Sequence, residues 1–434
     1  MINFLIILFF VTCFNFYTIS SNASSSSYLI SKSAYNDYDY ITVILESKNI
    51  KNIEENSILV DQLISSTITE NLILANKISK KILLNDPDNL EANLINIVGN
   101  ILNNNKNKLL SNKIFDNNEL IDFIFFSDQK IKTKEQVSNS FVEIVRSSYS
   151  NSVNLEVINY NYLLFYISLA IIVNPLNDDA LFIKAQLYQM LEKYFLAENS
   201  YKKIEKSSSY YSDAQRNIAF NYSKFLDNNE AEKKILEIID QNEKKYLIKR
   251  ILADFYRING KYQKAIEVYN DLILEEEKDL WNLYYLRGIC FERLDLWNKA
   301  EKDFLYSLKI NPNSPNVLNY LAYGWLERNM NIDNSLNMLK KAYQKSPDNH
   351  YIIDSLAWAY FKKNNLVKAA TLMEKVIDIA PGEAISLDHL ADIYFAMNRK
   401  REAVHFWKQA QDLAEPEDNI YDKIEEKLRA LNAG

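Results

Sequence analysis

The stretch HYIIDSLAWAY, residues 350 to 360, carries a histidine, an aspartate and a serine within six positions. A nucleophilic serine needs an exposed hydroxyl, a histidine base within hydrogen-bond reach and an oxyanion hole, and it commonly sits on a strained turn. His350 and Asp354 are spaced so that they could touch along one helix. Ser355, however, is expected in the middle of that helix beside Leu356, where these conditions are not met. The stretch therefore predicts no catalytic site.

The composition of the 434-residue chain argues against several classes of function. A formal net charge of −7, with no dominant block of lysine and arginine, disfavours nucleic-acid binding, which needs a basic patch. The chain has six glycines and neither a GxGxxG nor a GxxxxGKS/T motif, so it offers no phosphate-binding loop. Three histidines without an HExxH or CxxC motif predict no metal site. We expect no catalysis, no cofactor and no metal.

The first 23 residues are expected to be an export signal or an anchor. Residues 1 to 19 are apolar and uncharged, and Ser21-Asn22-Ala23 then match a small-x-small cleavage site. Two alternatives stay open: an uncleaved anchor of about 18 residues, which is just long enough to span a bilayer, and lipidation at Cys13, whose neighbours fit that motif poorly. After cleavage Cys290 would be the only cysteine, which excludes an intramolecular disulfide. We expect a location in the periplasm or cell envelope, with membrane contact only through this segment if it is retained.

Segments of about 34 residues recur along the chain. When segments starting at residues 178, 212, 246, 281, 315, 350 and 384 are written under one another, the same residue types share a column. The eighth column is small: Ala185, Ala219, Ala253, Gly288, Ala322, Ala357 and Ala391. The twentieth, with one extra residue in the fifth segment, is also small: Ala197, Ala231, Ala265, Ala300, Ser335, Ala369 and Ala403. The eleventh is aromatic: Tyr188, Tyr222, Tyr256, Phe291, Trp325, Tyr360 and Tyr394.

Each column has a mechanical cause in a pair of packed helices. Helix axes lie about 8 to 10 Å apart and need small side chains where they cross, and a large residue fills the space beside the crossing. Prolines near the segment ends, such as Pro312, Pro347 and Pro381, stop the second helix. The pattern resembles the tetratricopeptide repeat. That resemblance implies an all-α fold, a right-handed superhelical solenoid of helix-turn-helix repeats.

The repeat pattern varies in strength along the chain. Residues 178 to 417 are expected to hold seven tetratricopeptide repeats, and residues 144 to 177 a degenerate repeat. Residues 24 to 143 are expected to form divergent helical repeats, with the organisation of residues 99 to 143 left open. Residues 418 to 434, DNIYDKIEEKLRALNAG, predict a capping helix whose polar face keeps the open end of the solenoid soluble.

The resemblance also implies where a partner would bind. In repeats of this type, the second, fifth, ninth, twelfth and thirteenth positions of the first helix face a concave groove. In the last three repeats these positions supply acceptors beside aromatic rings: Asn319, Tyr323, Asp354, Trp358, Phe361, Asp388, Asp392 and Phe395. Carboxylates would accept the NH or cationic groups of an extended peptide, and the aromatic rings would take its apolar side chains. The alternative is a solvated polar face with incidental aromatic residues.

Other conspicuous residues are expected to be structural. Trp297, Trp407 and Cys290 fall at columns that pack between helices. His389 and His405 have no cysteine or acidic pair at ligand spacing, so we expect them to be hydrogen-bonded or exposed.

Residues 318 to 412 resemble the C-terminal repeats of a family of proteobacterial envelope proteins. The runs NYLAYGW, IIDSLAWAY and DHLADIYF carry the match, which extends more weakly back to residue 144. Some members of that family are outer-membrane lipoproteins that act as adapters for a periplasmic C-terminal processing protease and present cell-wall hydrolases to it. The chain differs in its poor lipidation motif and in the alanines of the eighth column, where glycine is frequent.

The resemblance implies a non-catalytic scaffold or adapter of the bacterial cell envelope. It would bind a protein or an extended peptide in its groove, with a periplasmic protease or its substrates as candidate partners. A self-assembling structural envelope protein, with another copy in the groove, is the alternative. An enzyme would need a cavity with converging titratable groups, which the sequence does not show.

Overall fold

The computed structural model describes residues 25–50, 56–105, 119–127, 130–150, 159–242, 245–275, 279–415 and 420–432. These residues are almost wholly helical, which confirms the predicted all-α class. The chain divides into two compact units, Met1–Lys244 (unit 1) and Lys245–Gly434 (unit 2). The expected signal or anchor, residues 1 to 23, lies outside the described residues.

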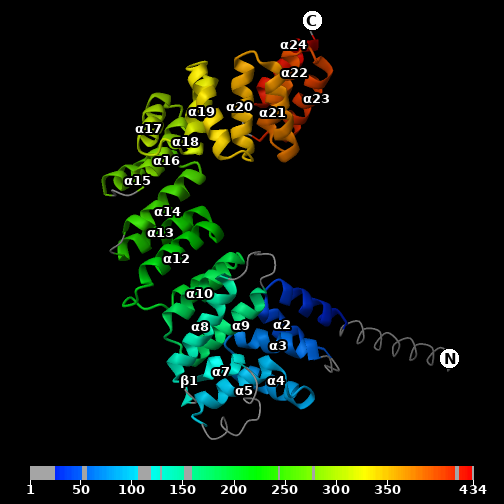
Figure 1. The fold of residues 1–434 in the computed structure, drawn as a ribbon, viewed down its shortest axis with the longest axis vertical. Coiled ribbons are helices and arrows are strands. Elements are labelled where there is room, and N and C mark those ends of the chain that lie inside the picture. The colour runs from blue at the N-terminus through cyan, green and yellow to red at the C-terminus, as the bar shows by residue number, and fades with distance from the viewer. Residues whose placement is uncertain are drawn as a thin grey trace, which may run out of the picture. The chain divides into compact units, whose positions relative to one another are not determined.

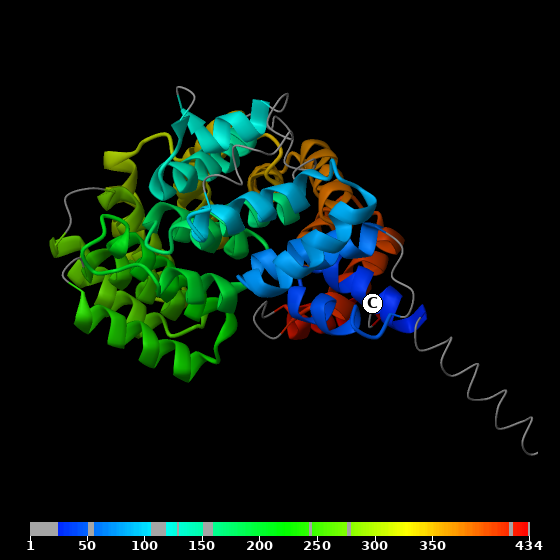
Figure 2. The same cartoon turned by 90° about the horizontal axis from the view of Figure 1, so that it is seen from below.

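Unit 2 is a succession of helix pairs in which each helix packs against the next (Figures 1 and 2, green to red). Its first helices begin at or within one residue of the predicted segment starts. The helices are α14 (Lys245–Ile258), α15 (Tyr262–Glu275), α16 (Leu280–Arg293), α17 (Trp297–Ile310), α18 (Pro315–Glu327), α19 (Ile332–Lys345), α20 (His350–Lys362), α21 (Leu366–Ile379), α22 (Ala384–Ala396), α23 (Lys400–Leu413) and α24 (Tyr421–Asn432). The last, α24, lies within the segment expected to form the capping helix.

A left-handed turn recurs at the fifteenth position of six repeats. The residues there have positive φ: Glu192, Gly260, Asp295, Asn329, Asn364 and Asn398. In each case the next residue donates its backbone N–H to the carbonyl of the eleventh-column aromatic at 2.8 Å: Lys193 to Tyr188, Lys261 to Tyr256, Leu296 to Phe291, Met330 to Trp325, Asn365 to Tyr360 and Arg399 to Tyr394. This bond satisfies a carbonyl that the end of the helix leaves free. Asn, Asp and Gly suit the position because they enter the left-handed region at low cost.

The small columns lie where the helices cross, as predicted. The eighth- and twentieth-column alanines of unit 2 are fully buried. A Cβ on Gly288 would lie 2.7 Å from the Phe304 ring, so that crossing has no room for alanine. Trp297 packs against Gly324, where an added Cβ would lie 2.2 Å from the indole. Trp297, Trp407 and Cys290 are buried, as expected from their columns. Burial raises the pKa of the Cys290 thiol to about 12, so it is not a reactive thiolate.

Unit 1 departs from a simple linear stack. Its elements are α2 (Tyr40–Glu46), α3 (Asn56–Ile68), α4 (Leu72–Asn85), α5 (Leu90–Leu102), α7 (Glu119–Phe125), β1 (Phe126–Ser127), β2 (Lys130–Ile131), α8 (Lys134–Ser150), α9 (Tyr160–Val173), α10 (Asp178–Met190), α11 (Tyr194–Tyr201), α12 (Tyr211–Phe225) and α13 (Asn228–Gln241). Both α3 and α5 pack against α9, far along the chain (Figure 1). The Tyr40 hydroxyl donates to Asn161 Oδ1 at 2.7 Å and joins α2 to α9. The two strands form a short antiparallel hairpin, the one pair of strands in the part of unit 1 that is described.

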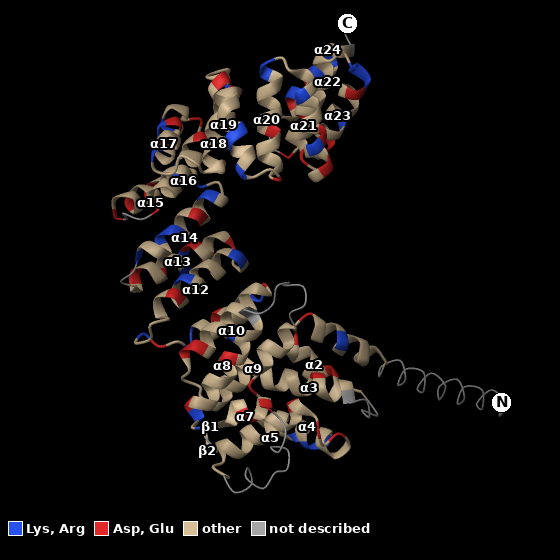
Figure 3. Ribbon diagram, viewed as in Figure 1, with Lys and Arg blue, Asp and Glu red and all other residues tan. Residues whose placement is uncertain are grey.

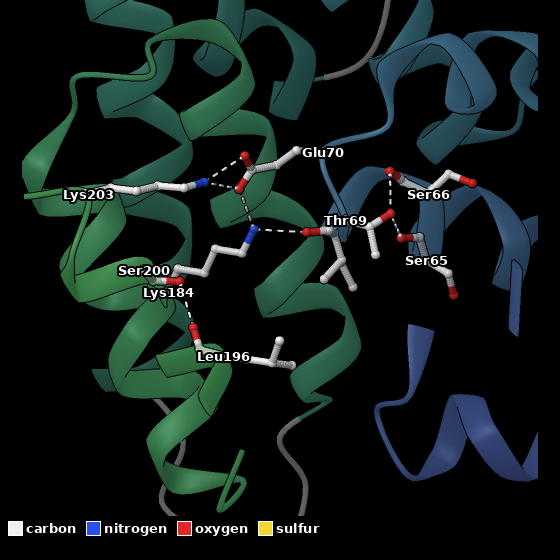
Figure 4. A network of polar contacts seen from close by, with 9 residues as sticks. Ser65, Ser66, Thr69, Glu70, Lys184, Leu196, Ser200 and Lys203 are labelled. Carbon is white, nitrogen blue, oxygen red and sulfur yellow. Dashed lines mark hydrogen bonds and ion pairs between the residues drawn. The ribbon is translucent and has the colours of Figure 1, made fainter. Parts of the chain in front are cut away.

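A buried lysine joins the first helices of unit 1 to its first clear repeat (Figure 4). Lys184, on α10, donates to the Ile68 carbonyl and to Glu70 Oε1, both at 2.9 Å. Lys203 reaches the other oxygen of Glu70 at 2.9 Å from a more exposed position. Burial lowers the pKa of Lys184, and the attraction of Glu70 partly offsets that shift.

The surface charge is mixed. Lysine and arginine are interspersed with aspartate and glutamate along the helices of both units (Figure 3). Within the described ranges, no helix is both long enough and apolar enough to cross a membrane.

Candidate functional site

The stretch HYIIDSLAWAY forms α20, which begins after Asn349. The Asn349 side chain caps the helix by accepting from the backbone N–H groups of Tyr351 and Ile352. Ser355 is buried, and its hydroxyl donates to the Tyr351 carbonyl at 3.0 Å. His350 lies near Glu383, with 3.9 Å between Nε2 and Oε1. Ser355 thus lies in the middle of the helix, as expected, but the contact considered between His350 and Asp354 is not formed.

Asp354 instead pairs with the following repeat. Its Oδ1 lies 2.8 Å from His389 Nδ1, and its Oδ2 accepts the Ser386 hydroxyl at 2.5 Å. Burial alone disfavours the imidazolium, but the adjacent Asp354 carboxylate outweighs it and raises the pKa of His389. His389 is therefore a hydrogen-bonded histidine, one of the two outcomes expected from the sequence.

Trp358 is stacked against other rings and is not exposed on the groove surface. Its indole stacks on the ring of Phe361, with centroids 4.7 Å apart, and on the imidazole of His389, with centroids 4.1 Å apart. Its Nε1 donates to Glu327 Oε1 at 2.8 Å. Only 7% of the residue is exposed, so Trp358 supports the groove from below and offers a partner little surface.

The acidic residues of the last repeat are held by the C-terminal helix. Lys427, on α24, lies 2.7 Å from Asp388 Oδ1 and 2.7 and 2.9 Å from the two oxygens of Asp392. Asp392 also accepts from Trp407 Nε1 at 3.0 Å. Burial and then repulsion from Asp392 raise the pKa of Asp388, while Lys427 opposes that shift. The two carboxylates thus anchor α24 against α22.

Beside this anchor lies a hollow of about 550 Å³ between α20, α22, α23 and α24. Its lining is mainly apolar and aromatic with three charged side chains: Phe361, Asp392, Phe395, Ala396, Lys400, Trp407, Lys427, Ala430 and Leu431. Trp407 is buried as a floor, whereas 43% of Phe395 is exposed at the rim. An aromatic hollow of this size with a few fixed polar groups is typical of a binding site.

The structure brings together three of the eight predicted groove residues in this hollow: Phe361, Asp392 and Phe395. Asp354, Trp358 and Asp388 support it from beneath or beside it through the contacts above. Tyr323 is half-buried, and burial raises the pKa of its hydroxyl well above the usual value. Asn319 Oδ1 is buried without a hydrogen-bond partner. Contact of any of the eight with a partner stays a prediction.

Lys400, Lys427 and Leu431 were not predicted from the sequence as parts of the site. Lys427 and Leu431 belong to the segment interpreted only as a polar-faced cap. The available signal was their spacing from Ile424, which is buried in the core: three and seven residues place them on one side of a helix. Among the residues that the structure describes, no three His, Cys, Asp or Glu side chains are grouped so that they could hold a metal ion.

Helix pairs of tetratricopeptide length, with small residues at the crossings and an aromatic before the turns, give the chain a tetratricopeptide-type repeat fold. No family model matches the chain. It is 27% identical over 124 residues to the TPR repeat-containing protein PA4667 of Pseudomonas aeruginosa, covering 29% of this chain and 20% of that protein. It is 29% identical over 104 residues to the BBSome complex member BBS4 of Mus musculus, covering 24% of this chain and 19% of that protein. The chain thus spans about a fifth of the length of these curated relatives.

The chain also matches solved structures. A tetratricopeptide repeat protein from Parabacteroides merdae is 21% identical, with a TM-score of 0.45, and the match covers 57% of this chain and 96% of that chain. Yeast Tom70 is 12% identical, with a TM-score of 0.38, over 94% of this chain and 97% of that chain.

Proposed function

We propose that this protein is a non-catalytic scaffold that binds a polypeptide segment of a partner in the hollow of unit 2. The observation that carries the proposal is the lining itself, in which Phe361, Phe395, Trp407 and Leu431 surround one opening. Helical repeat proteins use such surfaces for protein recognition. Burying one Leu- or Phe-sized side chain there would contribute roughly 1.5 to 3 kcal/mol.

The hollow is held in place before a partner arrives. Trp407 is fixed by its hydrogen bond to Asp392, and Asp392 by Lys427. Phe361 is fixed by stacking on Trp358, which is held in turn by Glu327. Side chains that are already ordered lose little entropy on binding, so more of the contact energy appears as affinity.

The finer role that we propose is that of an adapter in the bacterial cell envelope. It is supported by the apolar residues 1 to 19 followed by a cleavage-type sequence, and by the resemblance of residues 318 to 412 to envelope repeat proteins. A periplasmic protease or its substrates are the partners that this resemblance suggests. Mass spectrometry of the protein from fractionated bacterial cells tests the location. A mature chain beginning near Ser24 in the envelope fraction is expected, and an intact Met1 in the cytoplasmic fraction would contradict export.

Photo-cross-linking tests binding at the hollow. A photoreactive phenylalanine analogue at residue 395 should form an adduct with a partner polypeptide in intact cells, and mass spectrometry of the adduct identifies the segment bound. Leu305, on α17, is the matched control because it is exposed to a similar degree on another helix of unit 2. Adducts at residue 305 but none at residue 395 would move the binding surface away from the hollow.

A further inference from the structure

The acidic residues of the groove are already paired within the chain. Asp354 is paired with His389, and Asp388 and Asp392 share the ammonium group of Lys427. Of these carboxylates only Asp392 lines the hollow, and both of its oxygens accept from Lys427. A cationic partner group would have to compete with an ion pair that also anchors α24. The acidic column is therefore less available to a cationic partner group than the sequence suggests.

One cationic side chain that lines the hollow is unpaired. Lys400, the first residue of α23, lines the hollow and is exposed, and its side chain forms no ion pair or hydrogen bond with any residue in the described part of the chain. Lys427, also in the lining, keeps part of its side chain exposed beside it. An anionic group seated next to the aromatic rings would meet Lys400 without breaking a contact.

We infer that the hollow takes a partner segment in which a bulky apolar side chain stands next to a carboxylate. The apolar side chain would lie between Phe361, Phe395 and Trp407, and the carboxylate would pair with Lys400. This inference rests on the proposed function, because it names the chemistry of the polypeptide that the hollow would bind. It reverses the expectation from the sequence, where the acidic column favoured NH or cationic groups.

Three small probes of one shape separate the possibilities: 3-phenylpropionate, 3-phenylpropanamide and 3-phenylpropylamine, which are anionic, neutral and cationic at pH 7. Each is titrated into the full chain carrying 5-fluorotryptophan and followed by ¹⁹F NMR. The chain has five tryptophans, and the Trp407 signal, assigned with Trp407→Phe, reports on the floor of the hollow. Probes with about a dozen heavy atoms should bind with dissociation constants on the order of 1 to 10 mM.

We expect the propionate to shift the Trp407 signal with an affinity about fivefold higher than that of the amide, the size of one solvent-exposed ion pair, and the amine to bind weakest. Lys400→Gln should remove the preference. Lys408→Gln, an exposed lysine further along α23 that does not line the hollow, should keep it. High salt should shrink the preference as well.

The other outcomes are decisive in different ways. Equal binding of propionate and amide, or tighter binding of the amine, would overturn the inferred carboxylate while leaving the apolar hollow as a binding site. A Trp407 signal unmoved by all three probes at tens of millimolar would overturn the hollow as a docking site, and with it the proposed function.

Discussion

His389 Nδ1 lies 2.8 Å from Asp354 Oδ1, and the pair joins α22 to α20 across the boundary between two repeats. The two side chains are only 7% and 9% exposed. Because His389 also stacks on Trp358, and Trp358 on Phe361, one buried ion pair supports the wall of the hollow. A repeat protein owes its rigidity to such contacts between neighbouring repeats.

Replacing Asp354 with alanine should lower the free energy of unfolding of unit 2 by about 3 kcal/mol, because it leaves a buried histidine without its counter-ion. Urea unfolding followed by tryptophan fluorescence measures the change, since all five tryptophans lie in unit 2. The control is Asp333→Ala, which breaks the exposed pair with Lys363 and should cost less than about 1 kcal/mol. Equal losses of unfolding free energy in the two variants would mean that the Asp354 pair stabilises unit 2 no more than an exposed ion pair does.

The stability of unit 2 should fall as the pH rises above the ordinary histidine pKa of about 6.5. Burial opposes protonation of His389, but Asp354 outweighs it, so the pKa of His389 is raised in the folded chain. Asp388 on α22 and Glu327 on α18 also favour the charged form. A raised folded pKa gives a stabilisation that is complete below the unfolded pKa and is lost as the pH passes the folded one.

Unfolding free energies at pH 6 and pH 8.5 test this dependence. His389→Gln should flatten it, whereas His405→Gln, at an exposed position of α23, should leave it in place. The same slope in the His389→Gln variant would assign the dependence to another group.

Gly324→Ala should destabilise unit 2 by about 1 to 3 kcal/mol, because the new methyl group would overlap the Trp297 indole. Alanine normally stabilises a helix interior relative to glycine, so the sign of the effect is diagnostic. Gly382→Ala is the control, because a Cβ there meets no heavy atom within 4 Å. A Gly324→Ala variant as stable as the native chain would show that Trp297 is free to move aside.

Lys184→Met should loosen the first helices of unit 1. It removes the buried ammonium group that binds the Ile68 carbonyl and Glu70. The loss should lower the free energy of unfolding of unit 1 by about 3 kcal/mol. Faster hydrogen exchange in α3 and α4, measured by mass spectrometry, would report the change. Lys203→Met removes only the exposed partner of Glu70 and should cost less than about 1 kcal/mol. Unchanged exchange in Lys184→Met would contradict a structural role for the buried lysine.

The helix pairs could be predicted from the sequence because each crossing demands a small residue at a fixed spacing. Ala357 and Ala369 mark one such crossing, and both are fully buried. The recurrent left-handed turn was missed because its residue changes between Glu, Gly, Asp and Asn, which share a backbone conformation rather than a side-chain type. The packing of α3 on α9 could not be anticipated, since no repeat column encodes a contact between distant helices.

The candidate site was predicted in part. Repeat positions placed Phe361, Asp392 and Phe395 on one side, and the hollow brings these three together. The same positions gave no sign that Asp354 would pair with His389 or Asp392 with Lys427. Those partners lie two helices further along the chain, on α22 and α24, and position within one repeat does not report what the next repeat contributes.

Binding at the hollow is tested most directly by titrating a synthetic peptide, copied from the segment cross-linked at residue 395, into the native chain and into two variants. Phe395→Ala should raise the dissociation constant at least about tenfold, which is the effect of removing an anchoring side chain. Leu305→Ala should leave it within about twofold, and both variants should unfold at the native urea concentration, because both residues are exposed. A dissociation constant unchanged by Phe395→Ala, or weakened only by Leu305→Ala, would contradict the hollow as the binding site.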